Sequence, residues 1–377
     1  MTSNKHLYRY LIDKIKKSGK LQFSDFMNEV LYNVDFGYYT NKEKIFDREG
    51  DFVTTPIISS LFGECLSEEF INITHSLEEP SILEFGGGDA SLLISMLKKL
   101  KKQNCLPSKY IIIEISPRLI ELQKKNIKKE IPELFNLIEW KRNLDEISID
   151  GLIIANEFFD SLPTERFKYD GNNFVMSYIA ESDDNLKEVW DKITNEQNKE
   201  LKIAIGKREK VFLKNYVSEL NMEYKKWIQN INKSINNGVV MIIDYGYNGQ
   251  EYFLDDRMEG TLVCIHNHQS HFDPLINVGR QDISSFVNFS HLSNLAEKND
   301  FLVDGYLSQS SSLLNLGILE IYENKEYKSD QKVIELNKLK NILLPNTMGE
   351  IFKVLVLKKN INKNLLSTKE FNHTYKL

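Results

Sequence analysis

Four short, continuous apolar runs constrain the fold of this chain more than any other feature of its sequence. They are SILEF at 81–85, YIIIEI at 110–115, LIIA at 152–155 and VVMIID at 239–244. Each is rich in β-branched residues and does not alternate with polar ones, which is typical of strands buried on both faces of a parallel sheet. Between the first three runs, residues 91–102 and 117–129 carry apolar side chains at helical spacing. This succession predicts an α/β fold with a doubly wound, Rossmann-like sheet and right-handed crossovers.

The whole chain is expected to divide into five parts. They are an N-terminal helical and lid region (1–75), a first part of the core (76–164), an insertion between the fourth and fifth strands (165–235), a second part of the core (236–360) and a C-terminal tail (361–377). Within the insertion, two strand-like runs flank 170–173 as in a hairpin, and 211–235 has helical periodicity. In the second part of the core, 282–298 predicts a helix, and 301–307 and 351–357 predict strands.

Charge and cysteine content exclude several classes of protein. The net charge is −6 and lysines are interspersed among acids, which argues against a nucleic-acid-binding protein with a basic face. Cys65, Cys105 and Cys264 form no CxxC pair and fit a reducing compartment. The N-terminal segment is amphipathic, unlike a signal peptide, and no apolar run approaches the ~20 residues that span a bilayer. We therefore expect a soluble, cytoplasmic protein without membrane insertion.

A glycine-rich turn, Gly86-Gly87-Gly88, connects the first predicted strand to the next helix. Such turns let the backbone approach a cofactor closely, and both dehydrogenases and methyltransferases contain them. Glu84 and Asp89 flank this turn, and their charges would repel the pyrophosphate of a dinucleotide. An acidic turn suits a cofactor that carries a sulfonium and an ammonium group. This points to S-adenosyl-L-methionine rather than NAD.

The second predicted strand ends at Glu114. Ligands of open α/β sheets bind beyond the carboxyl ends of the strands, so this carboxylate is placed to accept both hydroxyls of a ribose. The alternatives are a turn that only packs, for the glycines, and a charge that leads into a helix, for Glu114. The predicted cofactor-binding residues of these two strand ends are Glu84, Phe85, Gly86, Gly88, Glu114 and Ile115.

The third predicted strand is followed by NEFFDSLP at 156–163. Two acids, an amide and two aromatic residues therefore lie at the carboxyl edge of a buried strand, where reacting groups are expected in such a sheet. The alternative is a cluster that only satisfies the dipole of a helix N-terminus. His266 and His268 have no third ligand at metal spacing, so no metal site is predicted.

In order along nearly the whole chain, several stretches resemble the MidA family of methyltransferases. They are YNVDFGYYT (32–40), GDFVTTPIISSLFG (50–63), EFGGGDAS (84–91), EISP (114–117), NEFFDSLP (156–163), DYGY (244–247), DPLINVG (273–279), DISSFVNF (282–289) and MGEIFK (348–353). GDFVT together with NEFFDSLP is far more specific than a glycine turn. This bacterial and mitochondrial family includes a complex I assembly factor that methylates a protein arginine. The resemblance implies a class I methyltransferase that dimethylates arginine symmetrically on a partner protein, such as a complex I subunit; a homodimer is a candidate assembly.

For an arginine substrate, Glu157 and Asp160 are the expected catalytic residues, because the planar fork of guanidinium donors matches carboxylates in bidentate geometry. Asn156 is expected to face the cofactor. A loop ahead of the sheet is expected to fold over the cofactor as a lid, since loops on a rigid scaffold commonly carry sites. The lid residues predicted to bind the cofactor are Asp51, Thr54 and Pro56.

The sequence departs from the usual family pattern at three positions. Asp89 reverses a charge where similar sequences carry GPGRG, and Ile57 replaces an acid of a PEIS motif. Trp140 is followed by Lys141 and Arg142 where the family tends to have an acid. Adenine recognition would then fall to Asn143, whose amide offers both a donor and an acceptor. Two other readings stay open: a methyltransferase for another nitrogen or oxygen nucleophile, and a non-catalytic assembly factor that binds the cofactor.

Overall fold

The computed structural model describes residues 4–41, 55–206 and 212–377. The chain forms two compact units, each assembled from three segments, whereas the five-part division proposed from the sequence follows chain order. The sheet unit comprises Val53–Phe158, Lys226–Gly246 and Ser293–Leu377. The accessory unit comprises Met1–Phe52, Phe159–Lys225 and Tyr247–Leu292.

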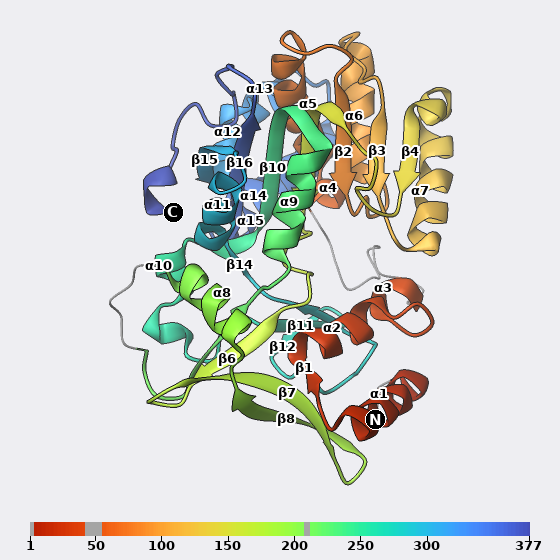
Figure 1. Ribbon diagram of the computed structural model, residues 1–377. Coiled ribbons are helices and arrows are strands. Elements are labelled where there is room, and N and C mark those ends of the chain that lie inside the picture. The colour runs from red at the N-terminus through yellow and green to blue at the C-terminus, as the bar shows by residue number, and fades with distance from the viewer. Residues whose placement is uncertain (1–3, 42–54, 207–211) are drawn as a thin grey trace. The chain divides into compact units, whose positions relative to one another are not determined.

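Seven strands of the sheet unit lie side by side in the order β15-β16-β10-β5-β2-β3-β4 (Figure 1). The strands β2, β3, β4, β5 and β10 are mutually parallel, and β16 is antiparallel to both of its neighbours. This confirms the predicted doubly wound sheet. The bounds are β2 Ser81–Phe85, β3 Tyr110–Ile113, β4 Ile138–Lys141, β5 Ile149–Asn156, β10 Ile235–Tyr247, β15 Leu302–Ser308 and β16 Phe352–Lys359.

Helices that follow the strands carry their apolar stripes into one core. The helix α6 spans Ser91–Lys102, as predicted, and buries Leu92, Leu93, Met96, Leu97 and Leu100. Pro117 begins α7, whose N-terminus is capped by the Ser116 hydroxyl. The helices that lie wholly or partly in this unit are α4 Thr55–Ile58, α5 Ser60–Thr74, α6, α7 Pro117–Glu130, α9 Tyr224–Ser234, α11 Phe289–Glu297, α12 Gln309–Asn315, α13 Ile318–Glu323, α14 Ser329–Leu343 and α15 Met348–Ile351, with 3-10 turns at Pro132–Leu137 and Thr374–Lys376.

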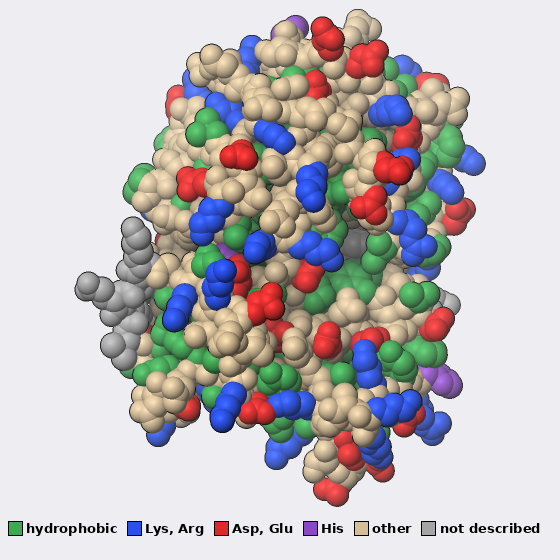
Figure 2. Space-filling model, viewed as in Figure 1, with side chains coloured by type: hydrophobic (Ala, Val, Ile, Leu, Met, Phe, Trp, Pro, Cys, Tyr) green, Lys and Arg blue, Asp and Glu red, His purple; other side chains and the backbone are tan. Residues whose placement is uncertain are grey.

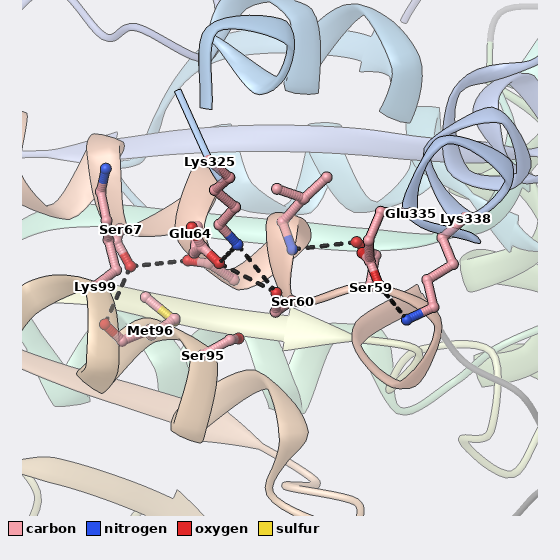
Figure 3. A network of polar contacts seen from close by, with 12 residues as sticks. Ser59, Ser60, Glu64, Ser67, Ser95, Met96, Lys99, Lys325, Glu335 and Lys338 are labelled. Carbon is pink, nitrogen blue, oxygen red and sulfur yellow. Dashed lines mark hydrogen bonds and ion pairs between the residues drawn. The ribbon is translucent and has the colours of Figure 1, made fainter. Parts of the chain in front are cut away.

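Polar contacts join α5 to the segment between α13 and α14 (Figure 3). Lys325 forms an ion pair with Glu64 and donates to the Ser60 hydroxyl at 3.4 Å. On the same helix the Ser67 hydroxyl donates to the carbonyl of Gly63 at 2.8 Å. The two Lys325 contacts fasten the segment around residue 325 to α5, whereas the Ser67 contact lies within α5 itself.

The accessory unit contains most of the predicted insertion and two smaller sheets. One sheet has the order β1-β7-β6-β9 with β8 on β7, and the other has the order β12-β11-β13. Their strands are β1 Leu21–Gln22, β6 Glu165–Tyr169, β7 Phe174–Ser182, β8 Asn185–Lys192, β9 Tyr216–Leu220, β11 Val263–His266, β12 Gln269–His271 and β13 Asp282–Ser284. The short strand β14 Val287–Asn288 belongs to neither of these two sheets. The helices are α1 Lys5–Ser18, α2 Phe23–Tyr32, α3 Tyr38–Asn41, α8 Asn195–Ile205 and α10 Gly249–Tyr252, with a 3-10 turn at Asp255–Arg257.

The predicted hairpin is confirmed, because β6 and β7 are antiparallel and Asp170 accepts the amides of Asn172 and Asn173. The helix predicted over 211–235 is wrong in its first half. There β9 pairs with β6, and Arg166 lies opposite Glu219, a long-range pairing that local periodicity cannot show. The helix predicted over 282–298 is also wrong at its start, where β13 pairs with β11 before α11 begins at Phe289.

Three further observations concern the surface charges, the helices and the side chains that could bind a metal. On the face shown in Figure 2, Lys and Arg side chains are mixed with Asp and Glu side chains. Among residues 4–41, 55–206 and 212–377, no helix combines the length and apolar character needed to cross a membrane. The same residues contain no group of three or more His, Cys, Asp or Glu side chains arranged to hold a metal ion.

Candidate functional site

The glycine turn after β2 forms an open cradle. Gly86 and Gly88 have φ values of +65° and +51°. Residues other than glycine adopt this backbone conformation only at an energetic cost. A Cβ built on either residue would meet no atom within 4 Å, whereas one on Gly87 would lie 3.0 Å from Ile112 and 3.2 Å from Gln123. The turn therefore packs on one side and leaves open space on the other, which fits close approach of a cofactor.

Asp89, one of the departures from the family pattern, has a local structural role. Its Oδ1 accepts the backbone amide of Ser91 at 2.9 Å at the start of α6. Its carbonyl accepts the Asn126 side chain at 2.9 Å. The neighbouring Ala90 is buried with φ of +72°. The acid thus satisfies a helix N-terminus, and the alanine keeps a left-handed backbone that glycine would adopt without strain.

Glu114 lies directly after β3 and is held by several donors. Its Oε1 accepts the Ser116 amide at 2.9 Å, and its Oε2 accepts the Gln123 side chain at 3.2 Å. Burial raises the pKa of this carboxyl, and the hydrogen bonds from Ser116 and Gln123 oppose that rise. The carboxyl is thus fixed at the end of a parallel strand, where the sequence analysis placed a ribose acceptor.

Gln123 holds the Glu114 carboxyl but was not among the residues predicted from the sequence, nor was its contact with Trp140. Gln123 is fully buried on α7 between Leu119 and Ile127, at i and i+4 spacing. The Trp140 indole donates to Gln123 Oε1 at 2.8 Å. A polar residue on the apolar stripe of a helix was a signal that could have identified it, because buried amides need partners.

Glu84 lies in β2 with its carboxyl inside the core. The Tyr110 hydroxyl donates to Glu84 Oε2 at 2.7 Å. Burial raises the pKa of Glu84 to about 8, although the Tyr110 hydrogen bond acts in the opposite direction. The acid that pointed to the cofactor in the sequence therefore has an internal partner on the neighbouring strand.

The turn after β5 begins with a strained residue. Glu157 has φ of +51°, which costs a side-chain-bearing residue of order 1–3 kcal/mol and is common at functional sites. Its amide donates to the Ile243 carbonyl at 2.9 Å. Asn156 Nδ2 donates to Glu157 Oε1 at 3.3 Å. Phe158 stacks on Phe85 at 4.8 Å between ring centroids.

The same turn continues in the accessory unit, where Asp160 lies in a network with a second acid. The Ser284 hydroxyl donates to Asp282 Oδ2 at 2.6 Å and is within hydrogen-bonding reach of Asp160. The Tyr39 hydroxyl donates to Asp282 Oδ1 at 2.7 Å. Burial, and then the Asp282 charge, raises the pKa of Asp160 to about 7. Asp282 was not among the predicted site residues, because the sequence placed it in a helix.

A family model described as "Putative S-adenosyl-L-methionine-dependent methyltransferase" matches residues 65–307. The chain belongs to this family. The match covers the glycine turn, Glu114 and the turn at 156–163. It confirms the predicted enzyme class and the predicted cofactor, S-adenosyl-L-methionine.

Curated relatives match most of this methyltransferase. A protein from Caenorhabditis elegans named protein arginine methyltransferase NDUFAF7 homolog, mitochondrial, is 27% identical, with 93% of this chain and 86% of the relative covered. The human protein arginine methyltransferase NDUFAF7, mitochondrial, is 26% identical, with 93% and 83% covered. A crystal structure from Burkholderia thailandensis with S-adenosyl-homocysteine bound shares the fold, with a TM-score of 0.92, 24% identity and 99% and 97% of the two chains covered.

The predicted cytoplasmic location is wrong by this comparison, because the relatives from worm and human are mitochondrial proteins. The prediction rested on the sparse, unpaired cysteines, on an N-terminal segment unlike a signal peptide and on the lack of a long apolar run. The cysteines were its only evidence on the redox state of the compartment. They indicate a reducing environment, and such an environment does not distinguish the cytosol from other reducing compartments.

The remaining predicted cofactor residues of the methyltransferase occupy varied surroundings. Phe85 is fully buried and Ile115 is exposed. Asn143 is exposed and pairs with Asp145, donating to its carboxyl at 2.7 Å. Pro56 lies in α4, next to the buried Thr55, whose hydroxyl donates to Gln309 at 3.3 Å. Asp51 and Thr54 lie outside the described residues.

Proposed function

We propose that this methyltransferase transfers methyl groups to an arginine side chain of a protein substrate and forms symmetric dimethylarginine. The observation that carries the proposal is a pair of buried acids. Asp160 lies in the turn that follows β5, Asp282 lies in β13, and both are within hydrogen-bonding reach of the Ser284 hydroxyl. The names of the curated relatives, which are protein arginine methyltransferases, support it.

Arginine makes particular demands on such a site. Its guanidinium stays protonated, with a pKa above ~12, and presents five donors in a plane. Bound S-adenosyl-L-methionine supplies a methyl group on a sulfonium. Glu157 and Asp160 would orient one terminal nitrogen and offset the positive charge that accumulates as the methyl group arrives. One proton leaves the guanidinium for each methyl gained, and the Asp160 carboxylate, with its pKa near 7, is suited to accept it.

Other residues are proposed to hold the cofactor. Gly86 and Gly88 would let the backbone of the turn approach the cofactor closely, since a Cβ at either residue would meet open space. Glu114 would accept the two ribose hydroxyls. Asn156 would face the cofactor at the next strand end, and Asn143 would contact the adenine edge. The lid residues Asp51, Thr54 and Pro56 complete the proposed set, together with Phe85 and Ile115. Glu84, also predicted from the sequence, is left out of the set because its carboxyl lies in the core and accepts the Tyr110 hydroxyl.

The proposed substrate protein is a subunit of respiratory complex I. The proposed assembly of the enzyme itself is a homodimer. The substrate assignment rests on the resemblance to the MidA family. Sedimentation equilibrium of the purified chain tests the dimer, and a monomer at micromolar concentration would reject it.

The test of the proposed function is to incubate the purified protein with methyl-labelled S-adenosyl-L-methionine and a mitochondrial extract, then hydrolyse the labelled proteins to amino acids. Label in symmetric dimethylarginine is expected. Label on lysine or a carboxyl group would instead identify a methyltransferase for another nucleophile. Cofactor binding by calorimetry without any transfer would indicate a non-catalytic assembly factor.

A further inference from the structure

Gln123 is a buried amide in α7 whose two ends face different partners. Its Nε2 donates to Glu114 Oε2 at 3.2 Å and to the Gly88 carbonyl at 3.1 Å. Its Oε1 accepts the Trp140 indole N–H at 2.8 Å. The side chain is fully buried. One side chain therefore links the ends of three neighbouring parallel strands, β2, β3 and β4.

The chemistry of the three partners fixes which way the amide points. An indole N–H can only donate, so the oxygen of Gln123 must face Trp140. A carboxylate and a carbonyl can only accept, so the nitrogen must face Glu114 and Gly88. The opposite orientation would place like groups against each other at all three contacts. Trp140 thus determines that an N–H donor is presented to Glu114.

The contact also lies directly beneath the glycine cradle. A Cβ on Gly87 would come within 3.2 Å of Gln123 Nε2, so the turn is packed on this amide. Displacement of the amide would therefore move the Gly88 carbonyl and the Glu114 carboxyl together. Both belong to the edge where the cofactor is proposed to bind.

We propose that Gln123 is a positioning residue for the cofactor site, which sets the Glu114 carboxylate against the glycine turn so that it can grip the ribose hydroxyls. This inference rests on the proposed role of Glu114 as the ribose acceptor. The competing view is a buried amide that only stabilises the packing of α7 on the sheet. The two views differ in what they predict for ribose selectivity, because general packing does not distinguish a hydroxyl from a hydrogen atom.

The experiment measures, by calorimetry, the dissociation constants of S-adenosyl-homocysteine and of its 2′-deoxy analogue. Wild-type protein is expected to prefer the ribose form at least tenfold, since a site built around a hydroxyl is left unpaired without it. Gln123→Leu removes the donor and is expected to reduce the preference to less than threefold. Gln123→Glu keeps the shape but sets a second acid against Glu114, so its affinity for S-adenosyl-homocysteine should also fall as pH rises.

Two controls separate the possible failures. Ile127→Val trims a fully buried residue one turn further along α7 and should lower the melting temperature while keeping the ribose preference. Glu114→Ala removes the acceptor and should abolish the preference. If Glu114→Ala keeps it, the proposed role of Glu114 is wrong. If Glu114→Ala abolishes it but both folded Gln123 variants keep it, the inference about Gln123 is overturned and the amide is structural.

Discussion

The turns that follow β2 and β5 differ in how they are held. The turn after β2 is supported by residues of the sheet unit: Asp89 accepts the first backbone amide of α6, and Gln123 joins Gly88 to Glu114. The turn after β5 starts in the sheet unit and ends in the accessory unit, because the boundary falls between Phe158 and Phe159. Asp160 there shares a network with Asp282, more than a hundred residues later.

This difference indicates a division of work between the two turns. The first has relaxed glycines at its left-handed positions, Gly86 and Gly88, and open space above them, which suits a cofactor common to many methyltransferases. The second places Glu157 in a strained conformation and collects acids from distant segments, which suits a particular substrate. We therefore expect changes in the first turn to affect cofactor binding and changes in the second to affect transfer.

The largest expected effect is that of Asp160→Asn on turnover. The variant keeps the shape but removes a charge that stabilises the methylated guanidinium, so turnover should fall on the order of 10²–10³, or about 3–4 kcal/mol. Labelled methyl transfer measures turnover, and calorimetry measures cofactor affinity, which should stay within twofold. Asp183→Asn, in the exposed turn between β7 and β8, is the control. Loss of cofactor affinity in Asp160→Asn would erase the distinction between the turns.

Glu114→Ala tests the complementary expectation that a change beside the first turn lowers cofactor affinity and leaves transfer unchanged. The loss of a charged hydrogen-bond acceptor should weaken cofactor binding by about 1.5–3 kcal/mol. Turnover at saturating cofactor should remain near that of the wild type, because the acids of the second turn are intact. Unchanged affinity in Glu114→Ala would mean that this acid is a part of the fold and not of the site.

The free energy of unfolding should depend on pH through Glu84, the buried acid of β2. The pKa of Glu84 is raised to about 8, so the folded state holds this proton more tightly than the unfolded state. The contribution of Glu84 to stability is therefore full below about pH 4.5 and is lost as pH rises through about 8, with a slope of at most about 1.4 kcal/mol per pH unit. Urea unfolding of wild type and Glu84→Gln between pH 5 and 9 measures the difference, and parallel curves would contradict it.

The smallest expected effects concern backbone strain in the two turns. Glu157→Gly should stabilise the fold by about 1 kcal/mol, since glycine adopts a positive φ without a Cβ clash, while transfer is lost. Ala90→Gly relieves similar strain but gives up a buried methyl group, so the two terms should cancel to within about 0.5 kcal/mol. Chemical unfolding compares the two. A destabilised Glu157→Gly would show that its side chain supports the fold rather than the function.

The fold could be predicted from the sequence, and so could the place in the fold of some residues of the candidate site, for physical reasons that specific residues make clear. The strands at 81–85 and 152–155 could be recognised because burial on both faces leaves a continuous apolar run. Glu114 could be placed because the ends of parallel strands meet at one edge. Asp282 could not, since its position depends on the pairing of β13 with β11. Gln123 required knowledge of which side chains face it, and periodicity gives only the face of the helix.

The most direct test of this division is Glu157→Gln, measured for cofactor affinity and for methyl transfer on the same preparation. The substitution keeps the side-chain shape and the hydrogen bond from the backbone amide of residue 157 to the Ile243 carbonyl, but it removes one negative charge. The predicted result is transfer reduced on the order of 10²–10³ with cofactor affinity nearly unchanged. Wild-type transfer would contradict the account by showing that the carboxylate is structural. A parallel loss of affinity and transfer would place Glu157 in the cofactor site instead.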